Sequence, residues 1–285
     1  MAVLTIRPDA RLTVPGTLFV VATPIGNLAD SSPRSIEVLR SADIVACEDT
    51  RTSRTLLAHH GIDARTVALH AHNEREAGEK LLRALREGQN VALVSDAGTP
   101  AISDPGALLV AAAHREGLRI VPLPGPNAAI AAYSASGFVS DRFVFAGFLP
   151  AKREKALDSL DLPWPVILYE APHRVMQTVE ALLARFGAQR ELVIAREISK
   201  KFEEVVRLPL GEAPAWLAAG PHRQAGEFVL VLGPGEDKRP ELAEAGRVLG
   251  ILLEQLPASE AAKLASKISG VPKKDLYAIA VKRAK

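Results

Sequence analysis

Residues 16–57 read GTLFVVATPIGNLADSSPRSIEVLRSADIVACEDTRTSRTLL and contain the pattern that decides the fold. The β-rich run Thr17–Ala22 leads into a Gly/Pro-rich turn, and a helix is expected to begin near Ser32, with Pro33 at its first position. The apolar run Asp43–Cys47 again precedes a helical segment. Strands that alternate with helices need crossover connections, so this stretch predicts an α/β domain with a largely parallel sheet.

The alternation continues to about residue 135. The expected strands are Thr66–His70, Val91–Ser95 and Leu118–Leu123, and the expected helices are Glu74–Arg86, Ala107–His114 and Ala128–Ala135. After Gly137 the helix signal weakens and short connections join several strands, which favours antiparallel pairing. There the expected strands are Phe143–Gly147, Val166–Tyr169, Glu191–Ala195, Glu203–Leu208 and Glu227–Leu232, and the expected helices are Pro172–Phe186 and Ala213–Ala219.

These patterns predict two α/β domains and a tail. Residues 15–138 form the first domain, with a largely parallel sheet, and residues 139–235 form a second α/β domain with a mixed sheet. The segment Gly233–Pro240 has the composition of a linker, and residues 240–285 are expected to be a small, basic helical tail.

Composition indicates the compartment. The chain has 285 residues, more than one typical domain, and 48% of them are hydrophobic, which is enough for a substantial core. The single cysteine, Cys47, excludes an internal disulfide framework and is expected in the core. Arg7, Asp9 and Arg11 interrupt the first apolar residues, and the longest aliphatic run, residues 107–113, is too short for a bilayer. We expect a soluble, cytoplasmic protein.

Three Gly/Pro-rich loops follow strands of the first domain: Thr23–Asp30, Ser95–Gly106 and Pro122–Asn127. Because the carboxyl ends of parallel strands share one edge of a sheet, these loops are expected to form a ligand site there. Each loop alone is also compatible with ordinary turn chemistry, with Asp104 as the cap of the helix that follows.

Common nucleotide, zinc and nucleophile motifs are not found in the sequence. It contains no GxxxxGK[ST], no GxGxxG that opens a helix after the first strand, and no GxSxG elbow. One cysteine and seven scattered histidines give no pair of ligands at zinc spacing, so no metal is expected.

Several long motifs of the chain resemble one known family. Besides residues 16–57, they are LHAHNE at 69–74, VSDAGTPAISDPG at 94–106, PLPGPNA at 122–128, GFLP at 147–150 and YEAPHR at 169–174. The chain thereby resembles, over about residues 15–285, the small-subunit (16S) rRNA cytidine 2′-O-methyltransferases of the tetrapyrrole-methylase (class III) superfamily. The resemblance implies S-adenosylmethionine in a cleft between two α/β domains, a homodimer, and a cytidine of the ribosomal decoding centre as the substrate.

The resemblance also implies which residues bind the donor. The first loop contributes Pro24 and Ile25, and the second contributes Ser95, Asp96, Gly98 and Thr99. The third loop contributes Asn127 and Ala128, and a strand end of the second domain contributes Leu168 and Tyr169. The wider superfamily often has Gly-Gly-Asp-Pro where this chain has residues 95–98, Ser-Asp-Ala-Gly. That departure favours an rRNA substrate over a porphyrinoid.

Charged clusters supply candidates for the remaining chemistry. A ribose hydroxyl is a poor nucleophile, so a nearby base assists its attack, and the candidates for this catalytic role are Glu48 and Glu170. Candidate RNA-binding residues in the two domains are Arg51, Asn73, Arg174 and Arg196. The alternative for the cluster at residues 48–51 is a solvated helix start that Asp49 or Thr50 caps. His70 and His173 are expected to be hydrogen-bonded structural histidines.

The tail is the most basic part of the chain. Residues 259–285 carry a net charge of +5, which leaves −3 for the rest. Two helices, Ser259–Ser269 and Lys273–Arg283, are expected to pack through two apolar stripes, Leu264 with Ile268, and Leu276 with Ile279 and Ala280. This helix-turn-helix outline predicts RNA binding through Lys263, Lys267, Lys273 and Lys274. The alternative is a solvated helical cap on the second domain.

Two other functions stay open on the sequence. A methyltransferase of the same fold that acts on a tetrapyrrole or a protein side chain leaves the basic tail unexplained. A ribosome-assembly factor that binds RNA and keeps only a vestigial donor pocket accounts for the tail without catalysis. For the assembly factor, as for the rRNA methyltransferase, the expected partner is small-subunit rRNA or the assembled 30S subunit.

Overall fold

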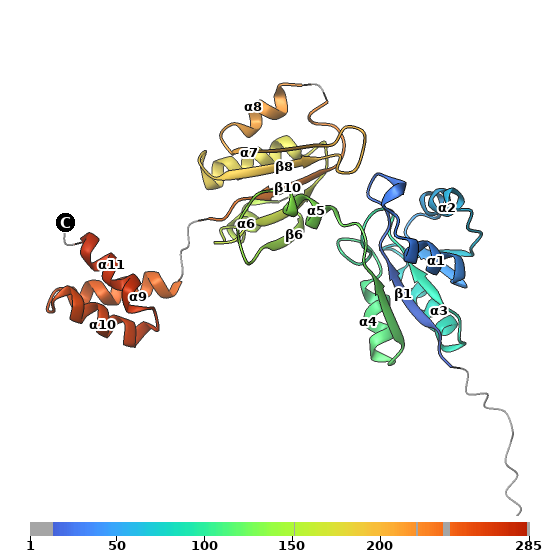
Figure 1. Cartoon of the computed structure of the whole chain (residues 1–285), viewed down its shortest axis with the longest axis horizontal. Helices are drawn as coiled ribbons and strands as arrows, with labels where there is room; N and C mark the ends of the chain where they lie inside the picture. The colour runs from blue at the N-terminus through green and yellow to red at the C-terminus, as the bar shows by residue number, and fades with distance from the viewer. Residues whose placement is uncertain (1–13, 151, 221, 236–239, 284–285) are drawn as a thin grey trace, which may run out of the picture.

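The computed structural model describes residues 14–150, 152–220, 222–235 and 240–283. Within these ranges the chain forms two five-stranded sheets, each covered by helices, and a group of three C-terminal helices (Figure 1). The charged residues Arg7, Asp9 and Arg11, half of the expected linker (residues 236–239), and Lys285 lie outside the described residues.

The first sheet is fully parallel, as the sequence predicted. Its strands are β1 (Thr17–Val21), β2 (Ile44–Cys47), β3 (Thr66–Ala68), β4 (Val91–Leu93) and β5 (Arg119–Leu123). They lie in the order β3-β2-β4-β1-β5, and every pair in this sheet is parallel. The inner strands β2 and β4 are buried on both faces, and Cys47 is fully buried at the end of β2, as expected.

Local chemistry fixes where the helices of this domain begin. They are η1 (Leu28–Asp30), α1 (Pro33–Ser41), α2 (Thr50–His59), α3 (Glu74–Arg86) and α4 (Ala107–Arg115). Ser32 caps α1 by accepting a hydrogen bond from the Ser35 amide, and Asp49 caps α2 through the Arg51 amide, both as the sequence suggested.

The start of α4 departs from the sequence interpretation. Its N-cap is Gly106, at φ 118°, and not Asp104, two residues earlier. The side chain of Glu74 replaces a local cap, because its Oε1 accepts hydrogen bonds from the amides of Gly106 and Leu108. Asp104 is therefore not used as a cap and is available for another role.

The second sheet is mixed. Its strands β6 (Val144–Phe148), β7 (Val166–Glu170), β8 (Glu191–Arg196), β9 (Glu204–Pro209) and β10 (Phe228–Leu232) lie in the order β6-β7-β10-β8-β9. Only the β6–β7 pair is parallel, so the predicted antiparallel pairing is confirmed for the other three pairs. The helices are α6 (Glu154–Asp158), which the sequence analysis missed, α7 (Val175–Phe186) and α8 (Ala213–Ala218).

Helix α5 (Ala128–Ser134) lies between the two sheets in the chain. It follows the last strand of the first sheet, but its buried residues Ala129 and Ala132 pack with Ile167, Val193 and Val229 of the second sheet. The chain thus crosses from one sheet to the other at residues 124–127, the Pro-Gly-Pro-Asn loop.

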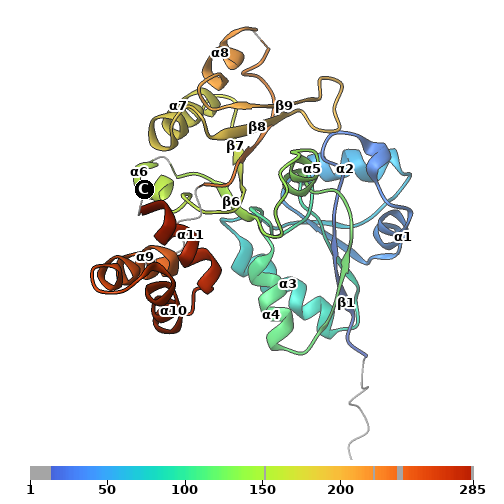
Figure 2. The same ribbon diagram turned by 60° about the vertical axis from the view of Figure 1, so that its left-hand side comes forward.

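The C-terminal helices α9 (Pro240–Leu253), α10 (Ala258–Ser269) and α11 (Lys273–Arg283) form a core of their own (Figure 2). Leu276 and Ala280 of α11 are buried there, as predicted. The stripe predicted on α10 is wrong, since Leu264 and Ile268 are 40% and 65% exposed. The small residues of α10 face the core instead and let its neighbours approach closely; they are Ala261, Ala262 and Ala265.

No helix in the described part of the chain is long and apolar enough to cross a membrane.

Candidate functional site

Strand order brings the three Gly/Pro-rich loops together. Because β1 lies between β4 and β5, the loops that follow these strands leave the sheet side by side at its carboxyl edge. The amide of Thr23 donates to the carbonyl of Gly98 at 2.8 Å, and the Gly98 amide donates back at 3.0 Å. The Thr99 hydroxyl donates to the carbonyl of Pro126, also at 3.0 Å. Each loop is therefore bonded to the next.

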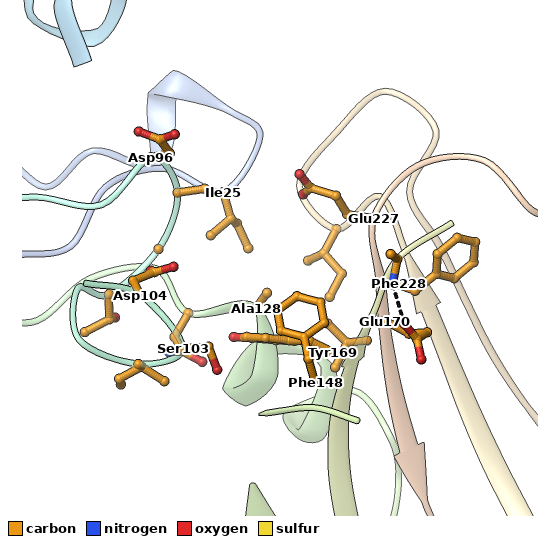
Figure 3. A pocket seen from close by; sticks show the side chains of 18 of the residues that line it. Ile25, Asp96, Ser103, Asp104, Ala128, Phe148, Tyr169, Glu170, Glu227 and Phe228 are labelled. Carbon is orange, nitrogen blue, oxygen red and sulfur yellow. Dashed lines mark hydrogen bonds between the residues drawn. The ribbon is translucent and has the colours of Figure 1, made fainter. Parts of the chain in front are cut away.

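A cavity of about 370 Å³ opens where these loops meet the second sheet (Figure 3). This volume suits a ligand about as large as a nucleoside with a short side chain. Ile25, Asp96 and Asp104 lie on the side of the first domain, across from Tyr169 and the other residues of the second (Figure 3). The remaining lining residues are Ala97, Gly98, Thr99, Ile102, Ser103, Asn127, Ala128, Phe148, Glu170, Ala171, Pro172, Ile198, Glu227, Phe228 and Val229.

Most of the expected donor-binding residues line this cavity: Ile25, Asp96, Gly98, Thr99, Asn127, Ala128 and Tyr169. Three do not. Pro24 and Ser95 line a neighbouring hollow beside α2, and Ser95 fixes the loop by donating to the carbonyls of Ala97 and Gly98. Leu168 is fully buried in the core, because neighbouring residues of a strand point to opposite faces and Tyr169 takes the cavity side.

Aromatic side chains form one wall of the cavity. The Tyr169 hydroxyl accepts a hydrogen bond from the Ala129 amide at 3.3 Å, which links β7 to α5. The ring of Phe148 contacts that of Tyr169, with the centroids 5.5 Å apart. Phe148 is nevertheless 54% exposed, so its ring offers a free apolar face at the mouth of the cavity.

Asp104 is the lining residue that sequence reasoning misplaced, because a Ser-Asp-Pro-Gly stretch resembles a helix start. Burial and, to a smaller extent, the negative charge of Glu48 raise the pKa of its carboxyl to about 6, against a hydrogen bond from Ser95 that lowers it. The loop before it contains two non-glycine residues in the left-handed region, Ala101 and Ser103, both at φ 64°. Strained backbone of this kind persists where its surroundings impose it.

Of the two carboxylates expected to act as the base, Glu170 lines the cavity and Glu48 does not. Glu170 is almost fully buried; its oxygens accept hydrogen bonds from the Ala171 amide and the Thr178 hydroxyl, and Arg174 pairs with it at 3.3 Å. Figure 3 shows its carboxylate on the side away from Asp104. Burial and the charge of Asp96 raise the pKa of Glu48, as would suit a general base. Its side chain, however, does not line the cavity.

The candidate RNA-binding residues divide into two groups. Arg51, which pairs with Asp49 at 2.7 Å but has a side chain 87% exposed, lies at the surface, as do Lys263, Lys267, Lys273 and Lys274. The other three make contacts within the chain, which gives them structural tasks that the sequence did not reveal. Arg174 donates to the Leu149 carbonyl, buried Arg196 donates to the Ala225 carbonyl and pairs with Glu204, and Asn73 bonds the backbone of His70 and Ala68.

A loop of the second domain, residues 197–200, contacts the loop that follows β1 in the first domain. In the segment Glu197–Lys200, the Ser199 hydroxyl donates to the Asp30 carboxylate, and the Lys200 side chain lies against Gly26, where a Cβ would come within 2.3 Å of its Cγ. Lys200 also pairs with Glu197 and Glu227. Glu197 and Ser199 adopt positive φ. This clasp, residues 197–200, holds the two domains together beside the cavity.

The lining fits a sulfonium nucleoside. The carboxylate of Asp96 complements positive charge, and the apolar side chains of Ile25, Ile102 and Phe228 suit a purine ring. Among the described residues no group of three His, Cys, Asp or Glu side chains is arranged to hold a metal ion.

Two family models match the chain. The one described as Tetrapyrrole (Corrin/Porphyrin) Methylases matches residues 17–214, and the one described as RsmI C-terminal HTH domain matches residues 239–284. The first match covers the first sheet and the second sheet as far as β9, and the second covers the three C-terminal helices.

Curated relatives are similar over nearly the whole length. The chain is 48% identical over 273 residues to Ribosomal RNA small subunit methyltransferase I of Escherichia coli O157:H7, a match that covers 94% of this chain and 96% of the relative. It is 50% identical over 275 residues to the protein of the same name from Pseudomonas aeruginosa, with coverage of 94% and 98%.

Solved structures share the fold at low identity. The cobalt precorrin-4 methyltransferase CbiF aligns with a TM-score of 0.58 and 18% identity, over 76% of this chain and 94% of that one. Uroporphyrin-III C-methyl transferase from Thermus thermophilus, complexed with S-adenyl homocysteine, aligns with a TM-score of 0.56 and 17% identity, over 78% and 98%. At such identities these likenesses show the fold alone.

Proposed function

Because the chain belongs to the ribosomal RNA small subunit methyltransferase I family of the tetrapyrrole methylases, we propose that it methylates small-subunit ribosomal RNA, with S-adenosylmethionine as donor. The position proposed is the ribose 2′-hydroxyl of a cytidine in the decoding centre of 16S rRNA, which rests on the motif resemblance described above. Ribosomal RNA is modified where ribosomes are assembled, so the proposed compartment is the cytoplasm.

The observation that carries this proposal is the cavity at the carboxyl edge of the parallel sheet. It brings the Asp96 carboxylate, an apolar wall and backbone from three bonded loops into one space of about 370 Å³. S-adenosylmethionine has a positively charged sulfonium and amino group at one end and adenine at the other. Both kinds of group find complementary side chains in this lining.

The donor supplies a methyl group that is already activated, and the protein must hold both partners in line. In this proposal Asp96 faces the cationic part of the donor, and Asn127, Ala128 and Tyr169 border its nucleoside part. Gly98 lets the backbone pass close to the ligand, since its φ of 85° is one that side-chain-bearing residues rarely adopt. Correct alignment alone supplies a large part of a methyl transfer rate.

The acceptor nucleotide would enter past Phe148, whose exposed ring is a platform on which a base can stack. Phosphates on either side would be neutralised by Arg51 and by the exposed lysines of α10 and α11. Because those helices carry the basic charge, the tail is proposed to deliver the RNA rather than to cap the second domain. A homodimer is part of the same proposal, on the family resemblance.

The experiment that tests the function is methylation of 30S subunits, and of naked 16S rRNA, that lack the modification, with purified protein and isotope-labelled donor. Transfer of label to a cytidine ribose is expected. Donor binding without transfer to either RNA would support the assembly-factor alternative. Transfer only to a tetrapyrrole or a protein would support the other methyltransferases of this fold.

A further inference from the structure

The carboxylates that line the cavity differ in the hydrogen bonds and ion pairs that they make within the chain. Asp96 accepts a hydrogen bond from the Asp49 amide at 3.0 Å. Glu227 is paired with the ammonium group of Lys200, and Glu170 is enclosed by Thr178, Arg174 and a backbone amide. Asp104 has the Ser95 hydroxyl as a neighbour and no cationic side chain paired with it among the described residues.

We propose that Asp104 is the catalytic residue that accepts the proton of the acceptor's ribose 2′-hydroxyl. This inference rests on the proposed function and replaces the two bases that the sequence suggested, Glu48 and Glu170. Asp104 lies in the cavity wall, on the loop that follows β4, and faces Tyr169 and Phe148 across the cavity (Figure 3). An acceptor ribose placed between these two sides would have this carboxylate beside it.

The step balances without any further reactant. The 2′-oxygen attacks the methyl carbon, the new O–CH₃ bond forms, and the S–CH₃ bond breaks with its electron pair left on sulfur. The O–H bond gives its proton to the Asp104 carboxylate. The products are the 2′-O-methylated ribose, the neutral thioether S-adenosylhomocysteine and a protonated Asp104, which returns the proton to water.

The surroundings of Asp104 suit it to this task. The groups that face it are Glu48, Asp96, Ser95 and Tyr169: burial and the two carboxylates raise its pKa, and only the serine hydrogen bond lowers it. With a pKa of about 6 the carboxyl is ionised at pH 7 and still more basic than an ordinary aspartate. A general base works best when its pKa lies near the working pH.

The backbone holds Asp104 in a defined place. Ala101 and Ser103 both adopt φ 64°. The loop is also tight against the second sheet, since a Cβ on Gly147 of β6 would come within 3.1 Å of the Ser103 hydroxyl oxygen. Backbone that its surroundings impose at two of the three residues before this half-buried carboxylate fixes where the carboxylate lies, as a preorganised catalytic group requires.

The test compares Asp104→Asn with Asp63→Asn, a matched change at an exposed aspartate outside the cavity. Donor affinity is measured by calorimetry, and single-turnover methyl transfer to small-subunit RNA is followed from pH 5 to pH 9. We expect the rate of Asp104→Asn to fall about 10²- to 10⁴-fold, with donor Kd within about twofold of the wild type. The wild-type rate and that of Asp63→Asn should rise with pH up to about 6 and then level, and Asp104→Asn should lack this step.

Either of two results would overturn the assignment. A full rate for Asp104→Asn would show that alignment alone suffices, and a donor affinity that falls in parallel with the rate would make Asp104 a donor-binding residue. Wild-type protein that transfers no methyl group to RNA would instead refute the proposed function, so the two failures are distinguishable.

Discussion

Thr23 and Gly98 pair their backbones in both directions, at 2.8 and 3.0 Å, although 75 residues separate them in the chain. This pair ties the loop after β1 to the loop after β4, and the Thr99 hydroxyl bonds the latter to Pro126 in the loop after β5. The carboxyl edge of the first sheet is therefore one bonded assembly, so its half of the cavity is formed before any ligand arrives.

Filling the cavity from α5 tests the donor site. Ala128 lines the cavity, so Ala128→Leu should put three extra carbons where the donor is proposed to lie and raise donor Kd about tenfold or more. The matched control is Ala135→Leu, at the exposed C-cap of the same helix, which should bind donor like the wild type. Calorimetry measures the donor Kd of each variant. Equal donor affinity in Ala128→Leu and Ala135→Leu would show that the donor binds elsewhere.

Removing the exposed ring at the cavity mouth tests the acceptor site. Phe148→Ala should raise KM for small-subunit RNA about 5- to 150-fold, the range that corresponds to loss of one base–aromatic stack, while donor Kd stays unchanged. Phe202→Ala, which removes an equally accessible ring (63% exposed) outside the cavity, is the control and should leave KM unaltered. If the two variants behave alike, Phe148 does not contact the acceptor.

Neutralising the tail tests how RNA is held. Replacement of Lys263, Lys267, Lys273 and Lys274 by Gln should weaken RNA binding and reduce the slope of log affinity against log salt by about 3, because each lost phosphate contact contributes about 0.7–0.9. The control replaces four exposed arginines of the first domain by Gln: Arg75, Arg83, Arg115 and Arg119. A salt slope that falls equally in both would leave the tail with no special part in binding RNA.

The raised pKa of Asp104 also predicts a change in stability with pH. An aspartate with a folded-state pKa of about 6, above the ordinary 3.8, contributes most to stability below pH 4, and this contribution is lost as pH rises to 6. Asn cannot ionise, so Asp104→Asn should raise Tm by about 2 °C at pH 7.5, for a gain discounted by solvent screening to on the order of 1 kcal/mol. Differential scanning fluorimetry at pH 4 should show no gain; a gain there as large as at pH 7.5 would contradict the shifted pKa.

The sequence predicted the two sheets and ten strands well, because buried parallel strands are short apolar runs between Gly/Pro loops. It also placed α3 at the observed residues 74–86, since an amphipathic repeat sets its length. It missed α6, whose five residues are too few for a periodic pattern. On α10 it assigned the apolar stripe to Leu264 and Ile268, but close helix packing selected the alanines.

The site was predictable as a set of loops and less so as individual side chains. Gly98 and Tyr169 were placed by their motifs, and both line the cavity. Glu170 and Arg196 were chosen because charged residues suggest chemistry, but contacts across the second sheet bury both. Asp104 resembled a cap, and only the distant Glu74, which bonds the start of α4, shows that it is not one. The burial of Glu170 and Arg196 and the capping of α4 by Glu74 depend on tertiary contacts that one sequence does not reveal.

The central claim is that this cavity and its tail methylate a ribose of small-subunit ribosomal RNA. The most direct measurement is mass spectrometry of nuclease fragments of 16S rRNA, taken from unmodified 30S subunits before and after incubation with the purified protein and S-adenosylmethionine. The account predicts one added methyl group, on the ribose of a single decoding-centre cytidine, and its loss with Asp104→Asn. No added methyl on any RNA fragment, or a methyl on a base instead of a ribose, would contradict it.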